Sequence, residues 1–182
     1  MCHTSVQTHK TMTKYLIGSL LLIAFLFMPS TAYAQMETKQ STQSLGRIQG
    51  FYVRVEIEGS VGLTSDEKLN VKAINQRVKR RLRDAGLNVI EPTEGFDQPM
   101  EPYLYVHINM MELEQGLVPF ANNLQFFQRV EIPGRRRKQS LIAATWDTGV
   151  VGLVSYDNLD MIADSAIESV NEFITDFQQV NP

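Results

Sequence analysis

The sequence predicts an α+β fold, a two-layer sandwich with two amphipathic helices packed on one face of a mixed, mostly antiparallel sheet. Residues 103–111 alternate apolar and polar side chains, and residues 51–58 do the same, which is the pattern of strands with one buried face. Residues 157–179 carry apolar side chains every three or four positions, as an amphipathic helix does. A helical stripe needs a partner surface, and one face of the sheet supplies it.

We expect the order strand, helix, strand, strand, strand, strand, helix. The first strand, residues 51–58, is followed by a helix. This helix begins at a capping box formed by Thr64 and Glu67 and ends at Gly86. Residues 87–90 then form a short second strand, and the intervening helix makes it parallel to the first.

Three further extended segments follow at residues 102–112, 123–132 and 141–153. Gly116 and Pro119 mark a turn between the first two of these segments. Two glycines inside the last one, Gly149 and Gly152, predict a bulge or a bend. The closing helix, residues 157–179, has an acidic outer face. The first helix is basic, so we expect their facing edges to neutralise each other.

The start of the chain has the parts of a cleavable secretory signal. Lys14 precedes an apolar run that is too short to span a membrane, and small residues at 32 and 34 place cleavage after Ala34. We therefore predict a signal peptide at 1–34, with Met12 as an alternative start, a flexible polar linker at 35–49 and one domain at 50–182. The expected location is the periplasm or the exterior, with no transmembrane segment after processing.

Charge and cysteine content exclude several classes of function. Cleavage after Ala34 would leave 15 basic and 20 acidic residues, a net charge of −5, which disfavours nucleic acid as a partner. The one cysteine, Cys2, would be removed, so neither a disulfide nor a thiolate metal site is expected. No calcium loop or other metal motif is present, and we assign no cofactor.

Several segments together resemble a family of small secreted bacterial proteins of unknown function. The resemblance covers roughly residues 51–182 and implies export and a shared fold, without catalytic residues. It is carried by the end of the basic helix at 81–89 (RLRDAGLNV), the strand at 102–106 (PYLYV), the segment at 145–149 (TWDTG) and the ending at 173–182 (FITDFQQVNP). More loosely, the element order is similar to helix-on-sheet domains of bacterial envelope proteins, such as the N-terminal domain of the Tol-system propeller protein.

The polar side of the sheet is the candidate binding surface. Aromatic side chains framed by charges are typical of protein interfaces, so we expect an envelope protein or a second copy of the chain as partner. The candidate residues on this face are Tyr52, Tyr105, His107, Phe127 and Trp146. A basic turn of Arg135, Arg136, Arg137 and Lys138 is a second candidate, for an anionic surface.

The favoured function is an exported, non-enzymatic binding or assembly module of the bacterial envelope. The alternative is a hydrolase that uses His107 as a general base with Asp147 as its orienting group. No nucleophile motif or paired-histidine motif accompanies these two residues, so no catalytic residue is assigned.

Overall fold

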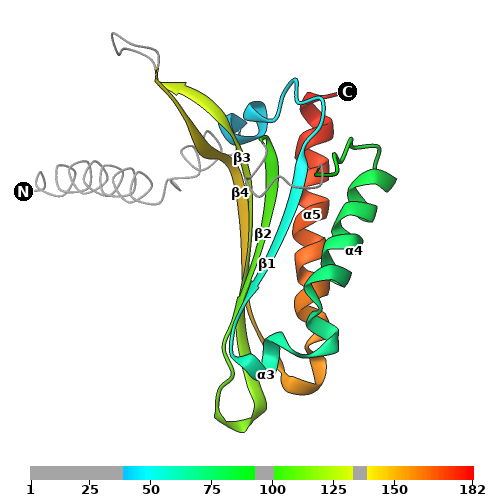
Figure 1. The fold of residues 1–182 in the computed structure, drawn as a ribbon, viewed down its shortest axis with the longest axis vertical. Coiled ribbons are helices and arrows are strands. Elements are labelled where there is room, and N and C mark those ends of the chain that lie inside the picture. The colour runs from blue at the N-terminus through cyan, green and yellow to red at the C-terminus, as the bar shows by residue number, and fades with distance from the viewer. Residues whose placement is uncertain (1–38, 93–100, 133–138) are drawn as a thin grey trace, which may run out of the picture. The chain divides into compact units, whose positions relative to one another are not determined.

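The computed structural model describes residues 39–92, 101–132 and 139–182, which form a two-layer α+β sandwich. The layers are one four-stranded sheet and two long helices on the same face of it (Figure 1). The strands are β1 (Tyr52–Glu58), β2 (Tyr103–Met110), β3 (Leu117–Ile132) and β4 (Gln139–Ser155). The long helices are α4 (Val71–Asp84) and α5 (Asp160–Val180), and short helical segments are α3 (Val61–Thr64), η1 (Glu67–Leu69), η2 (Glu114–Gly116) and η3 (Tyr156–Asn158).

The sheet is mixed, and its strands lie in chain order. β1 and β2 are parallel, while β2–β3 and β3–β4 are antiparallel pairs. The parallel pair requires a crossover, and α4 lies on the path between the two strands. The predicted two-layer class and the mostly antiparallel pairing are therefore confirmed, but the sheet has four strands where the sequence predicted five.

The core lies between the sheet and the helices, as the alternation predicted. Every second residue of β2, from Leu104 to Met110, is buried, and α5 buries its apolar stripe against the same face. Four aromatic rings contact one another at its centre: Phe51, Phe126, Trp146 and Phe173. Burial of side chains of this size is the main stabilising contribution of the layer arrangement.

Helix α4 begins later than the sequence predicts. The side chain of Asn70 accepts a hydrogen bond from Ala73 N and caps the helix, while Thr64 ends the separate turn α3. The predicted stop is correct: Gly86 has a φ of 85°, and Leu87 N donates to Leu82 O across the helix end. Residues 87–90 do not form a full strand. They contribute one parallel bridge, between Val89 and Phe51.

Pro119 lies inside β3 and does not end it. Its carbonyl accepts a hydrogen bond from Met111 N, one residue beyond the last residue of β2. A residue in an antiparallel strand points its N–H and its C=O to the same side. The N–H that proline lacks would therefore have pointed towards Met111, just beyond the end of β2. β3 therefore starts at Leu117 and is longer than predicted.

The described part of the predicted linker is folded onto the domain, which corrects the boundary at residue 50. Residues 39–44 are helical, and Leu45 is fully buried. Ser44 Oγ donates to Thr145 O at 3.0 Å, and Asn181 Nδ2 donates to Leu45 O at 2.9 Å. Polar composition suggested a tether because most of the anchors are hydrogen bonds between this segment and distant residues, which leave no hydrophobic periodicity. The signal-peptide prediction lies outside the described residues.

Candidate functional site

The outer face of the sheet, opposite the helices, carries a group of stacked rings that we call the aromatic cluster: Tyr103, Tyr105, His107 and Phe127. Tyr103 stacks on Phe127 across the β2–β3 pair, with ring centroids 5.0 Å apart and planes at 13°. Tyr105 stacks on His107 along β2 at 5.7 Å and 11°. An edge contact of 6.3 Å between Tyr105 and Phe127 joins the two pairs. All four side chains are partly exposed.

Charged side chains flank the aromatic cluster, and two of them, Glu56 and Arg54, contact the ring of Tyr105 or its hydroxyl. The hydroxyl of Tyr105 donates to Glu56 Oε2 at 2.8 Å, and Arg54 lies 3.2 Å from the same carboxylate oxygen. The Arg54 guanidinium also lies over the Tyr105 ring, 5.8 Å from its centroid, within cation–π distance. At the other end of the cluster, Arg129 pairs with Glu101 at 2.8 Å.

These contacts shift the acidity of the groups involved. Burial first, and the bond to Glu56 second, raise the pKa of Tyr105 to about 12. The reciprocal effect lowers the pKa of Glu56, mainly through the hydrogen bond from Tyr105 and further through Arg54. Tyr105 is thus a neutral hydrogen-bond donor at physiological pH, and its phenol is unsuited to act as a base there.

His107 lies beside a different carboxylate from the one that the sequence suggested. Its Nε2 is 3.2 Å from Glu58 Oε2, within ion-pair distance, but the described residues offer this buried atom no hydrogen bond. Asp147 lies on β4, beyond the intervening β3, where it pairs with Gln125. His107 itself pairs with Asn123, so the structure does not bring the predicted His107–Asp147 pair together.

Of the predicted surface residues, Tyr52, Tyr105, His107 and Phe127 lie on the outer face, and Trp146 does not. Trp146 is 2% exposed and packs edge-on against Phe173 in the core. The cause is a β-bulge: Phe126 pairs with Trp146 but Phe127 pairs with Ala144, so Thr145 is an extra residue that turns Trp146 inward. Its Nε1 donates to Asp176 Oδ2 at 2.8 Å.

Tyr103 was not among the candidate residues, although its alternation with Tyr105 placed it on the same face. Its stacking partner, Phe127, depends on the register of β2 with β3, which sequence periodicity does not give. The basic turn of Arg135–Lys138 lies outside the described residues, and its contact with an anionic surface stays a prediction.

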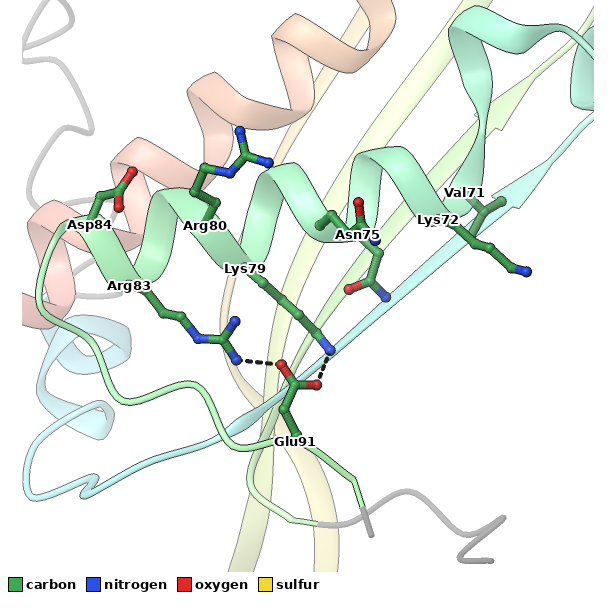
Figure 2. A pocket seen from close by; sticks show the side chains of 9 residues that line it. Val71, Lys72, Asn75, Lys79, Arg80, Arg83, Asp84 and Glu91 are labelled. Atoms are coloured by element: carbon green, nitrogen blue, oxygen red, sulfur yellow. Dashed lines mark hydrogen bonds and ion pairs between the residues drawn. The ribbon is translucent and has the colours of Figure 1, made fainter. Parts of the chain in front are cut away.

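A second candidate is a groove of about 640 Å³ along the solvent side of α4. Lys79 Nζ lies 2.6 Å from Glu91 Oε2, and Arg83 pairs with the other oxygen, so both cations converge on one carboxylate (Figure 2). These two hydrogen bonds lower the pKa of Glu91. The pairs fix the segment after α4 against the helix, and the carboxylate offsets one of the two positive charges that it contacts.

The predicted neutralisation between the two long helices involves only part of α4. Arg77 lies 2.6 Å from Asp164 on α5, and Arg81 Nε donates to Asn171 at 2.6 Å. The groove cations Lys79 and Arg83 turn instead to Glu91, as described above. Arg77 and Asp164 are both about half exposed, so this pair contributes about 0–1 kcal/mol.

Neither a metal site nor a membrane-spanning helix is found in the ranges that the structure describes. No group of three or more histidine, cysteine or carboxylate side chains there could hold a metal ion. Within the same ranges, no helix has the length and apolar character needed to cross a bilayer. No family model and no curated protein matches the chain.

Proposed function

We propose that this protein is an exported, non-enzymatic binding or assembly module of the bacterial envelope, which holds a protein partner against the aromatic cluster. The observation that carries the proposal is the position of the cluster: two stacked ring pairs lie on the sheet face opposite both long helices. Export rests on the sequence features of residues 1–34, namely the basic start, the short apolar run and the small residues before the cleavage point.

The chemistry of the surface fits a protein partner. Aromatic rings and arginine are enriched at the energetic centres of protein interfaces, and here Arg54 and Arg129 flank the rings. Stacking and the Tyr105–Glu56 hydrogen bond restrict the rings before any partner arrives, which lowers the entropic cost of binding. A hydrolase is less well supported, because the structure separates His107 from Asp147.

The test is affinity capture from an envelope extract with the purified protein as bait. We expect a specific captured protein to be lost, by about tenfold or more, when Tyr103→Ser and Phe127→Ser are combined, because the central stacked pair disappears. The matched control is Tyr156→Ser. Tyr156 is a partly exposed tyrosine in η3, outside the cluster, and its loss should leave capture unchanged.

Two results would contradict the proposal. One is equal capture by the wild type and the double variant when circular dichroism shows that both are folded. The other is an activity that His107→Ala abolishes while capture is unaffected, which would restore the enzymatic interpretation.

A further inference from the structure

The outer edge of β4 is an open strand edge with almost no charge. β4 is the last strand in the sheet order, and Asp147 is its only ionisable residue among 17. No backbone hydrogen bond from elsewhere in the described chain reaches residues 147–155. Three large apolar side chains are exposed in this stretch: Val150 at 41%, Val151 at 84% and Leu153 at 59%.

The opposite edge of the sheet is protected by comparison. β1 has seven residues, and Arg54, Glu56 and Glu58 are charged. The bridge to Val89 also covers its start, at Phe51. Charges and short length are the usual means by which proteins prevent pairing at an edge strand. β4 has neither lysine nor arginine nor proline, and its bulge at Thr145 lies before the exposed stretch.

We propose that a second copy of this chain pairs with residues 147–155 of β4, antiparallel, about a two-fold axis at Val151. The two four-stranded sheets then become one continuous sheet, and each copy satisfies the backbone groups of the other. An antiparallel pair of identical strands is self-complementary by symmetry, as a closed dimer requires.

The side chains of the stretch fit this register. Directly opposed residues lie on the same face, so Leu153 lies opposite the partner's Gly149, and Val150 lies opposite the partner's Gly152. Gly152 has a specific environment: an added Cβ would lie 2.5 Å from the ring of Phe120, so this ring covers the glycine. Val150 of the other copy would therefore meet an aromatic surface beside the glycine.

The charges also permit this register. Asp147 falls opposite Ser155, so no like charges meet along the strand. An axis at Asp147 would place the two aspartates directly opposite each other, which is destabilising. The uncharged run from Thr148 to Tyr156 lets a second copy approach without desolvating a charge on the strand.

The first experiment measures the mass of the purified protein by sedimentation equilibrium up to about 0.1 mM, a range that detects micromolar dimers. The wild type should be a dimer, and Val151→Lys should weaken dimerisation by about tenfold or more, because two lysines would meet at the axis. Val61→Lys is the matched control. Val61 is 81% exposed, in α3 outside the sheet, so the same change should leave the dimer intact.

The second experiment tests the register and does not depend on a lysine variant. In a Cys2→Ser background, Val151→Cys should form a disulfide dimer under mild oxidation, since the two positions are directly opposed. Leu153→Cys should not, because its two copies would lie four residues apart along the strands, about 13 Å, beyond the roughly 7 Å limit of a disulfide.

A monomeric wild type would overturn the proposal, as would a dimeric Val151→Lys variant or equal cross-linking at positions 151 and 153. The inference stands apart from the proposed function. The Tyr103→Ser and Phe127→Ser double variant should dimerise like the wild type, and its failure to do so would move self-association to the aromatic cluster.

Discussion

At the scale of single residues, Tyr105 has the environment with the clearest measurable consequence. Its hydroxyl donates to Glu56, its ring contacts His107 and Phe127, and Arg54 lies above it. An ordinary tyrosine ionises near pH 10, whereas the pKa of Tyr105 in the fold is about 12. Folding therefore favours the protonated phenol.

We predict that this difference makes the protein less stable as the pH rises from about 10 to about 12. In that interval the unfolded chain releases the phenol proton and the folded chain retains it. Ionisation therefore stabilises the unfolded state relative to the folded state. An absorbance titration of the folded protein should show the Tyr105 phenol ionising near pH 12. Denaturation measured across the same interval should show the loss of stability.

Tyr105→Phe should remove both signals, and Tyr156→Phe should leave the phase near pH 12 in place. The same Tyr105 variant should raise the pKa of Glu56 towards its ordinary value, because the hydrogen bond from Tyr105 is the main cause that lowers it. If the phase near pH 12 persisted in Tyr105→Phe, another phenol would be responsible.

The alternation of residues predicted which side chains share the outer face, but it did not predict their partners. Tyr105 and His107 face outward as expected. Their carboxylate partners, Glu56 and Glu58, come from β1, because β1 is the parallel neighbour of β2. Strand order depends on tertiary packing, so a sequence pattern with a period of two residues could not distinguish Glu58 from Asp147.

At the scale of elements, the segment before β1 is part of the fold. Besides the bonds from Ser44 and Asn181, Thr42 Oγ1 donates to Asp176 Oδ2 at 3.2 Å, and Gln128 Nε2 donates to Ser44 O at 2.9 Å. Leu45 is the fully buried apolar anchor among these polar contacts, and Ile48 packs against the core less deeply. The loss of Leu45 would leave a cavity beneath a segment held otherwise mainly by hydrogen bonds.

Leu45→Ala should therefore reduce the free energy of unfolding by about 2–5 kcal/mol, the usual cost of removing a buried leucine side chain. Chemical denaturation monitored by circular dichroism gives the measurement. Gln43→Ala is the control, because Gln43 is exposed and should change stability little. Equal stabilities of the two variants would mean that the segment is a tether after all.

The bulge in β4 shows a second limit of reading elements from sequence. The glycines at 149 and 152 suggested an irregularity, but the extra residue is Thr145, opposite the Phe126–Phe127 step. Its hydroxyl accepts a hydrogen bond from Gln128 Nε2 at 2.7 Å, a contact that exists only after the hairpin forms. One inserted residue inverts the alternation, which is why Trp146 was predicted on the wrong face.

At the scale of the whole molecule, the fold could be predicted because its strongest patterns are long and undisturbed. The alternation of β2 and the stripe of α5 continue over the whole of each element, and each requires the other as a cover. The two layers follow from this requirement, α4 follows from its own apolar stripe, and strands with one buried and one exposed face predict a mostly antiparallel sheet. The residues 87–90 were too few to sustain a strand, since only Val89 makes a bridge.

Phe51, just before β1, touches Phe173 and Phe177 on α5, with ring centroids 5.5 and 5.8 Å apart. The core around Phe51 therefore cannot be completed until α5, the last element of the chain, has been synthesised. Ribosome-bound chains arrested before Asp160 should accordingly be digested by protease as readily as a denatured control, whereas the released polypeptide should resist. A polypeptide that stays unfolded during synthesis is in the state that a secretion channel can thread. Resistance of the arrested chains to protease would refute this consequence.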